Sequence, residues 1–204
     1  AWASALVNAT LRNFIRQQEK ILKNIESDVV AQYSHPIWLI KALQKACPEK
    51  WQDILSANNE YPPMCLRVNL QKISRDDYLK KLEALDIKVN SVPSVASAII
   101  LEKPCDVSKL PEFKNGFVSV QDLSAQYAAS LLELKPGLSV LDACAAPGGK
   151  TSHVLEIEPK LKKLVAVDIR NERLAQVKNN FKRLHLSAQV VCGDAAKPQN
   201  WWDG

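Results

Sequence analysis

The 204-residue sequence predicts an α/β fold in its C-terminal part, preceded by helices and a small α+β unit. Two observations lead to this prediction. From residue 138 onward, short apolar runs alternate with segments of helical periodicity, which is typical of parallel strands joined by crossover helices. Three of these runs end in an acidic residue or a Gly-Asp pair, as strands do around a ligand in a Rossmann-like sheet.

The N-terminal region is predicted to be helical from its apolar spacing and its prolines. Residues 1–26 carry apolar side chains at helical spacing. Pro36 is expected in the first turn of a second helix, and Pro48 is expected to start a third. The Pro-Pro pair at 62–63 ends this region.

A small α+β unit is predicted next, with strands at 66–70 and 98–101 and a helix at 75–85. The α/β pattern is expected to begin with a short strand at 117–120. A helix follows at 122–134 and is closed by Lys-Pro-Gly.

The remaining elements alternate between strand and helix. Right-handed crossovers predict the strand order 3-2-1 for the three C-terminal strands, which leaves the outer edge of the first strand open and apolar. The expected strands are 138–141, 164–168 and 188–192, and the expected helices begin near 152 and 171.

The turn after the first of these strands, residues 142–151, reads Asp-Ala-Cys-Ala-Ala-Pro-Gly-Gly-Lys-Thr. A phosphate-binding P-loop fits its Gly-Lys-Thr end but needs a glycine where Cys144 stands. A dinucleotide fingerprint needs G-x-G-x-x-G, and the turn has only adjacent Gly148 and Gly149. S-adenosylmethionine, which has an adenosine but no phosphate, fits the turn better.

Two acids on the following strands support this interpretation. Asp168 ends the second strand about 20 residues after Gly148, the spacing of a ribose-binding carboxylate. Asp194 follows the third strand, where it can accept from the adenine amino group. Purely structural roles stay open: Asp168 can cap the next helix, and Asp142 can brace the turn.

The sequence resembles the RNA cytosine-5 methyltransferases, in particular the bacterial Fmu/Sun type that acts on small-subunit (16S) ribosomal RNA. The turn at 142–150 is the most specific part of the resemblance, which extends over nearly the whole chain. It therefore implies a class I methyltransferase core, of which this chain holds the N-terminal half only. The other matching segments are 33–39, 62–69, 116–122, 165–168 and 193–195.

The resemblance also assigns residues. Gln121 and Asp122 are expected to shape the floor near the methionine end, and Arg67 is expected to bind RNA, mainly at its phosphates. The residues expected to bind the cofactor S-adenosylmethionine are Cys144, Ala145, Ala146, Pro147, Gly148, Gly149, Lys150, Asp168 and Asp194.

The resemblance divides the chain into three parts. Residues 1–30 resemble the end of a helical antitermination-factor-like (NusB-like) domain, 31–115 form linker helices and the RNA-binding α+β subdomain, and 116–204 begin the methyltransferase domain. Ala1 stands where a start Met would, so we expect that the chain belongs to a longer one.

No catalytic residue is assigned. The chemistry needs a thiolate that adds to cytosine C6. The resemblance implies that this cysteine lies on a Thr-Cys-Ser segment and that an Asp-Ala-Pro-Cys segment carries a second cysteine, which helps to release the product. Neither segment occurs in these 204 residues. Of the five cysteines, Cys144 and Cys192 are expected to be buried small apolar residues.

Composition indicates which kinds of partner, metal site and location to expect. The net charge of +5 favours a polyanion as partner, and the resemblance implies that this partner is 16S ribosomal RNA. Unpaired cysteine spacing and three scattered histidines predict no disulfide framework and no metal site. With no membrane-length apolar run and no signal peptide, we expect a cytoplasmic monomer.

Three functions remain open from the sequence. The first is 16S ribosomal RNA cytosine-5 methylation, with these 204 residues binding cofactor and RNA weakly at most. The second is a non-catalytic RNA-binding or assembly module. The third is a nucleoside triphosphate hydrolase that uses Lys150 and Thr151.

Overall fold

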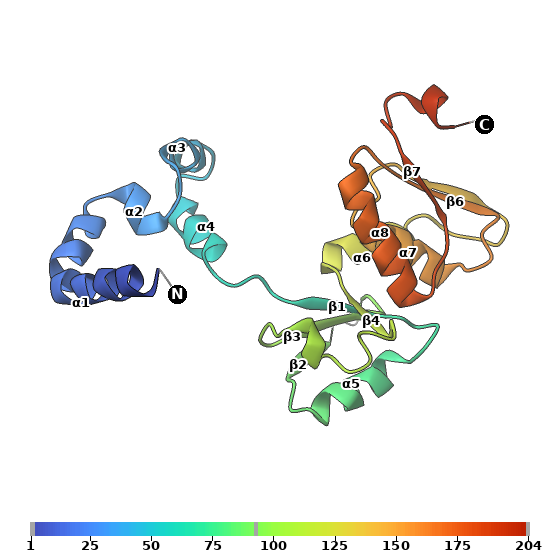
Figure 1. The fold of residues 1–204 in the computed structure, drawn as a ribbon, viewed down its shortest axis with the longest axis horizontal. Coiled ribbons are helices and arrows are strands. Elements are labelled where there is room, and N and C mark those ends of the chain that lie inside the picture. Colours follow the sequence, from blue (N-terminus) through green and yellow to red (C-terminus); the bar gives the residue numbers. More distant parts are fainter. Residues whose placement is uncertain (1–2, 92–93, 203–204) are drawn as a thin grey trace. The chain divides into compact units, whose positions relative to one another are not determined.

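A computed structural model describes residues 3–91 and 94–202 (Figure 1). The chain divides between Tyr61 and Pro62 into two compact units. The first unit is entirely helical, and the second unit holds both sheets.

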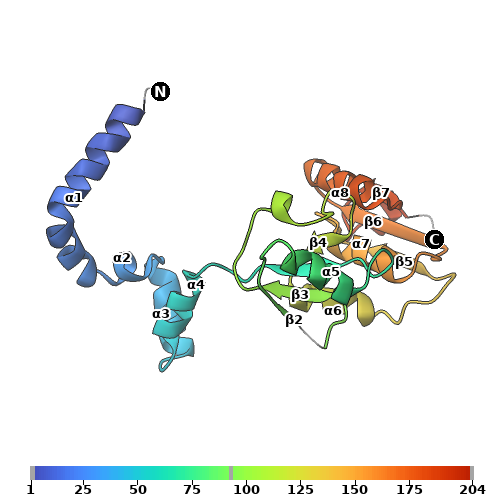
Figure 2. The same cartoon turned by 90° about the horizontal axis from the view of Figure 1, so that it is seen from below.

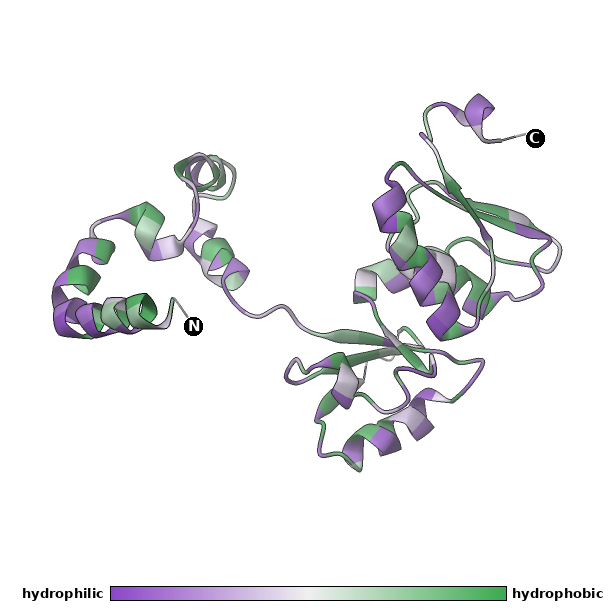
Figure 3. Cartoon of the chain, in the orientation of Figure 1, coloured by the Kyte–Doolittle hydropathy of each residue, from purple (hydrophilic) through white to green (hydrophobic). Residues whose placement is uncertain are grey.

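Four helices are described in the first unit: α1 (Ser4–Glu26), α2 (Val29–Tyr33), α3 (Ile37–Ala46) and α4 (Trp51–Asn58). Among its described residues only Ile40 and Leu55 are buried. The rings of Tyr33 and Trp51 pack edge to face, with centroids 5.3 Å apart. Apolar and polar residues alternate along α1 (Figure 3), and none of them is buried within this unit.

The helix predicted over 1–26 is confirmed as α1, with residues 1 and 2 outside the described part of the chain, whereas both proline-started helices begin later than expected. Pro36 has an extended backbone and caps α3, which starts at Ile37. Pro48 precedes a turn, and α4 starts at Trp51. The N-cap residue precedes the first helical turn. Pro36 is the N-cap of α3 and Lys50 is the N-cap of α4, so neither proline lies within a helix.

The second unit opens with a four-stranded antiparallel sheet. Its strands are β1 (Cys65–Val68), β2 (Val89–Ser91), β3 (Ala98–Leu101) and β4 (Val118–Val120), in the order β2-β3-β1-β4. Helix α5 (Arg75–Glu83) begins after Ser74, whose hydroxyl accepts from the Asp77 amide at 3.1 Å. Tyr78 and Leu82 of α5 are fully buried in the core of this sheet.

Strand β4 belongs to this sheet and not to the α/β part that it was expected to open. It pairs antiparallel with β1, with Leu66 opposite Val120. The sequence alone indicates a strand at this position but does not reveal its partner, because a three-residue strand can join either sheet. Strand β2 was not predicted, since Val-Asn-Ser is too short to show periodicity.

The α/β part contains a parallel sheet of β5 (Ser139–Asp142), β6 (Lys163–Asp168) and β7 (Gln189–Cys192). Its order β5-β6-β7 confirms the predicted 3-2-1 arrangement. Helices α7 (Gly149–Ile157) and α8 (Asn171–Leu184) lie together on one face (Figures 1 and 2). Helix α6 (Leu123–Ser130) packs against α7 and also contacts β1.

The outer edge of β5 is open, as predicted. No described strand pairs with it on that side. Leu138 and Leu141 are 42% and 45% exposed there. The three-residue helices η1 (Val107–Lys109) and η2 (Pro198–Asn200) complete the described elements.

Candidate functional site

The carboxyl ends of β5, β6 and β7 meet at one edge of the parallel sheet. Asp142 and Asp168 are the last residues of β5 and β6, and Gly193 and Asp194 follow β7. The Gly193 amide donates to the Asp168 carbonyl at 3.1 Å, which ties the second strand end to the third. The three acids singled out from the sequence therefore lie at the same edge.

The turn after β5 is fastened to the end of β6. The Ala145 amide donates to the Val167 carbonyl at 2.9 Å, and the Ala146 amide donates to Asp168 Oδ2 at 3.2 Å. Cys144 sits at the start of the turn with its amide 3.3 Å from Asp142 Oδ1. Backbone of the turn thus lies directly beside the Asp168 carboxylate.

Helix α8 holds the turn from the other side. Arg173 donates to the Ala146 carbonyl at 3.2 Å, and Asn180 donates to the Pro147 carbonyl at 2.8 Å. The Ala146–Pro147 peptide bond is cis. Arg173 and Asn180 were not predicted, because nothing in the spacing of a helix indicates which loop its polar face meets.

Gly148 occupies the position where the turn enters α7. Its φ of +97° lies in the left-handed region, which favours glycine. A Cβ there would lie 3.3 Å from both the Cα and the Cγ1 of Val177 on α8. Glycine therefore serves both the backbone conformation and the close approach of the turn to α8.

Asp168 is suited to hold a ribose. Hydrogen bonds from the Arg170 and Ala146 amides and the positive charges of Arg173 and Arg170 lower the pKa of Asp168. The carboxylate is therefore ionised at neutral pH, and each oxygen keeps a lone pair for a sugar hydroxyl. It does not cap the following helix, because the N-cap of α8 is Arg170.

Asp194 is half-buried in a turn at the end of β7. Its Oδ1 accepts from the Ala196 amide at 2.9 Å, and its carbonyl accepts from Trp201 Nε1 at 2.7 Å. The indole of Trp201 packs on Gly193, so closely that a Cβ there would lie 2.6 Å from the ring. The region next to Asp194 thus has a glycine-lined, aromatic wall.

Thr151 argues against a triphosphate site. Its hydroxyl donates to Asp142 Oδ2 at 2.6 Å, and the residue is fully buried. A P-loop requires this hydroxyl for Mg²⁺, whereas here it braces the end of β5. Asp142 therefore has the structural role left open by the sequence.

Arg67 does not lie on the surface, which corrects the expectation that it contacts RNA. It is 1% exposed, and its guanidinium forms a two-bond ion pair with Glu156 at 2.9 and 2.8 Å. It also donates to the Gln121 side chain at 2.5 Å and to the Gly149 carbonyl at 2.7 Å. Its inward position on β1 gives it a structural role between the antiparallel sheet and α7.

The residues before α6 have mixed positions. Gln121 is buried, and a Cβ on Gly149 would lie 3.9 Å from its amide nitrogen, so it lies beside the end of the turn. Asp122 is exposed and caps α6 without a side-chain hydrogen bond. Lys150 is exposed in the first turn of α7.

The prediction that Cys144 and Cys192 are buried is wrong, because both are exposed. They lie at the carboxyl ends of β5 and β7, where the edge of the sheet is uncovered in the part of the chain that the structure describes. Apolar burial of a small side chain needs an element packed over it, and no described element provides one there.

Within residues 3–91 and 94–202, no cluster of His, Cys, Asp and Glu has the geometry to hold a metal ion. The helices described in these ranges are each too short or too polar to cross a membrane.

Two family models match the chain. The model for the RsmF/B-like methyltransferase, ferredoxin-like domain matches residues 35–108. The model for the 16S rRNA methyltransferase RsmB/F matches residues 129–204. The first match includes three strands of the antiparallel sheet, and the second includes all of the parallel sheet.

Curated relatives match over the whole chain. Ribosomal RNA small subunit methyltransferase B of Pseudomonas syringae pv. tomato is 49% identical, covering 100% of this chain and 45% of the relative. Probable ribosomal RNA small subunit methyltransferase B of Coxiella burnetii is 46% identical, covering 100% of this chain and 48% of the relative. The chain therefore spans about half the length of these relatives.

Solved structures share the fold. A methyltransferase homolog protein from Pyrococcus horikoshii has a TM-score of 0.71 and 26% identity, covering 84% of this chain and 57% of its own. NSun6 from Pyrococcus horikoshii has a TM-score of 0.73 and 18% identity, covering 81% of this chain and 67% of its own.

Proposed function

Because the chain belongs to the 16S rRNA methyltransferase RsmB/F family, we propose that it is the cofactor-binding half of an RNA methyltransferase. The reaction is transfer of a methyl group from S-adenosylmethionine to C5 of a cytosine in 16S ribosomal RNA. The chain contributes the cofactor site and one side of the RNA-binding surface.

The observation that carries this proposal is the meeting of three strand ends around one turn. Asp168 accepts from the ribose hydroxyls, and Asp194 lies beside the adenine. The turn from Cys144 to Lys150 offers backbone close to the ligand because Gly148 lets it pack against α8. This set of groups fits an adenosine, and the buried Thr151 hydroxyl disfavours a triphosphate.

S-adenosylmethionine supplies an electrophilic methyl group when it is bound. Cytosine C5 becomes nucleophilic only after a thiolate adds to C6, and the C5 proton must leave before the thiolate is released. The segments that carry this cysteine in the family do not occur in these 204 residues. We therefore propose that the 204 residues alone transfer no methyl group to 16S ribosomal RNA, and detected transfer would overturn this.

Cofactor binding to the full-length protein tests the proposal. Calorimetric titration with S-adenosylmethionine is expected to show binding that weakens at least about tenfold in Asp168→Ala, since a charge-assisted hydrogen bond is worth about 1.5–3 kcal/mol. Asp76→Ala, an exposed acid on α5, is the matched control and should bind like the wild type. An unchanged Kd in Asp168→Ala, or tighter Mg²⁺-dependent binding of ATP, contradicts the proposal.

The organisation of the protein is part of the same proposal. Residues 1–30 end a NusB-like helical domain, 31–115 hold the linker helices and the RNA-binding subdomain, and 116–204 begin the methyltransferase domain. Strand β4 lies within this last range but completes the antiparallel sheet of the RNA-binding subdomain. The family's reaction on ribosomal RNA supports a cytoplasmic protein, and we propose that it acts as a monomer.

A further inference from the structure

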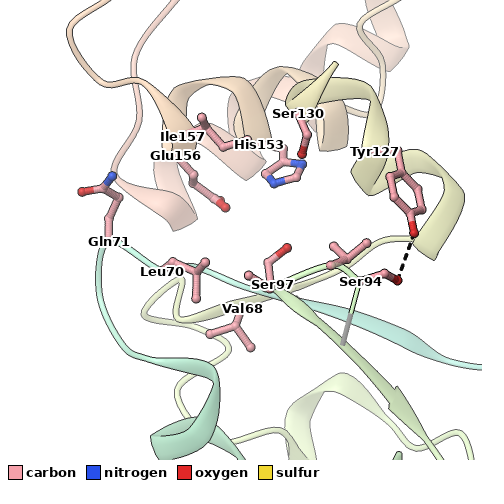
Figure 4. Close-up of a pocket in the computed structure, with 12 residues that line it drawn as sticks. Val68, Leu70, Gln71, Ser94, Ser97, Tyr127, Ser130, His153, Glu156 and Ile157 are labelled. Carbon is pink, nitrogen blue, oxygen red and sulfur yellow. Dashed lines mark hydrogen bonds between the residues drawn. The ribbon is translucent and has the colours of Figure 1, made fainter. Parts of the chain in front are cut away.

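The second unit contains a cavity of about 420 Å³ between its antiparallel sheet and the helices α6 and α7 (Figure 4). Its lining comes from the segment after β1, the residues just before β3, the α6 helix and the later turns of α7. None of the residues assigned to the cofactor lines it. The cavity is therefore a second concave site, formed by residues of the antiparallel sheet and its loops together with helices α6 and α7.

His153 projects from α7 into this cavity (Figure 4). The residue is 5% exposed, and its Nδ1 is buried without a hydrogen-bond partner. Nε2 also has no partner among the residues that the structure describes. Nδ1 is enclosed whereas Nε2 is not, so Nε2 is the ring nitrogen that a ligand in the cavity can reach.

The charge of the cavity limits what this ligand can be. Burial and the nearby Arg67 charge lower the pKa of His153 to about 4, so the imidazole is neutral at pH 7. The carboxylate of Glu156 is neutralised by its ion pair with Arg67. No lysine or arginine lines the cavity, so a phosphate or carboxylate would lack a counter-charge.

The remaining lining mixes apolar and polar side chains, with Val68 and Val95 buried in it beside Ser97. Leu70, Tyr127 and Ile157 are 51%, 40% and 40% exposed. Ser97 is buried, and its hydroxyl donates to Gln126 and keeps an acceptor lone pair. A ligand that fits is neutral and flat, with apolar faces and a hydrogen-bonding edge.

We propose that this cavity binds one unpaired nucleobase of the substrate RNA, with His153 Nε2 bonded to the base edge. The proposal rests on the proposed function as an RNA methyltransferase. Proteins read RNA mainly through unstacked bases that enter pockets and pack on side chains. Since the cavity and the cofactor turn share no residue, the bound base is one other than the modified cytosine, and the cavity contributes to the choice of site.

Two variants of the full-length protein test the cavity. His153→Phe removes the ring nitrogens at similar volume, and Ala96→Phe fills the cavity from an exposed lining position. Fluorescent single-stranded oligoribonucleotides tiled across 16S ribosomal RNA identify the best ligand by anisotropy. Both variants are expected to bind it about tenfold more weakly, as loss of one base contact does, with an unchanged Kd for S-adenosylmethionine.

Abasic substitution identifies the base. Removing one particular base from the oligonucleotide should weaken the wild type about tenfold and leave both variants unaffected. The slope of log K against log salt should stay the same in all three proteins, because no phosphate contact is removed. His153→Gln keeps an amide near the position of Nε2 and should retain most of the affinity.

Two results would overturn the proposal. The first is wild-type RNA affinity in Ala96→Phe, a variant that tests the cavity even if His153→Phe fails to fold; a lower melting temperature of that variant would then indicate that another segment of the protein fills the cavity. The second is that both variants lose as much affinity as the wild type at every abasic position. A wild-type protein that binds neither S-adenosylmethionine nor any oligonucleotide overturns the proposed function as well.

Discussion

The guanidinium of Arg67 is buried, and its hydrogen bonds all go to residues of the second unit. It joins β1 of the antiparallel sheet to Glu156 and Gly149 of α7, the helix that follows the cofactor turn. An RNA contact was predicted because the family resemblance places Arg67 in a matching segment, and no local pattern marks Glu156 as its partner 89 residues away. Long-range ion pairs of this kind depend on tertiary packing, which periodicity does not report.

Replacing Arg67 tests this link. We expect Arg67→Met to lower the free energy of unfolding by about 3 kcal/mol, because it leaves the Glu156 carboxylate buried and unpaired. The double variant Arg67→Met/Glu156→Leu should recover much of this loss. Urea denaturation of both, beside the exposed Arg12→Met as a control, measures the effect. Equal stability of the single and the double variant would contradict it.

His153 gives the protein a pH dependence. Its pKa is about 4 in the folded state and about 6.5 in the unfolded chain, so only the unfolded chain takes up a proton between these values. Stability should therefore fall as pH decreases from about 6.5 to 4, by up to about 3 kcal/mol. His153→Gln should lack this part of the fall in denaturation curves measured across that range, and identical pH profiles would refute the assignment.

The turn between β5 and α7 is the element on which sequence and structure agree best. Its small residues, the carboxylates at the strand ends and the strand order all follow from local patterns and from the handedness of crossovers. Its supports do not follow from them: Arg173, Asn180 and Val177 come from α8, and their contact with the turn appears only once the helix is packed.

Gly148→Ala tests how this turn is packed. We expect a loss of about 1–3 kcal/mol in the free energy of unfolding and weaker S-adenosylmethionine binding, since the backbone is left-handed and Val177 is 3.3 Å away. Gly137→Ala is the matched control, because its φ is +83° and no atom lies within 4 Å of the added Cβ.

A larger loss in Gly148→Ala than in Gly137→Ala isolates the contact with α8. Adding Val177→Ala to Gly148→Ala should recover the share of the stability loss that the contact with Val177 causes. A double-mutant cycle measures this share as a coupling energy. Equal losses in the two glycine variants would show that the contact with Val177 costs nothing.

At the scale of the whole molecule, the open edge of β5 sets the behaviour of the chain. Unpaired strand edges flanked by apolar side chains pair with other chains, and Leu138 and Leu141 are exposed beside this one. The 204-residue chain should therefore melt at a lower temperature and aggregate more than the full-length protein. Calorimetry and light scattering measure both, and equal melting temperatures would contradict the expectation.

A charged residue beside β5 tests whether aggregation comes from the open strand edge or from exposed apolar side chains in general. Leu138→Lys should reduce aggregation of the 204-residue chain severalfold, because a lysine beside an edge strand opposes pairing. Leu131→Lys, at an even more exposed leucine on the turn after α6, should have little effect. Equal rescue by both substitutions would mean that the edge is not the cause.

The pairing of β4 with β1 has a consequence for synthesis. Leu66 and Val120 face each other across 54 positions of the chain, with β2, β3 and α5 made in between. A nascent chain that has not yet released residue 120 from the ribosome cannot close the four-stranded sheet, so β1 keeps a free edge during that interval. The antiparallel sheet is therefore finished only moments before α6 emerges, and the first half of the chain waits for the second to complete its fold.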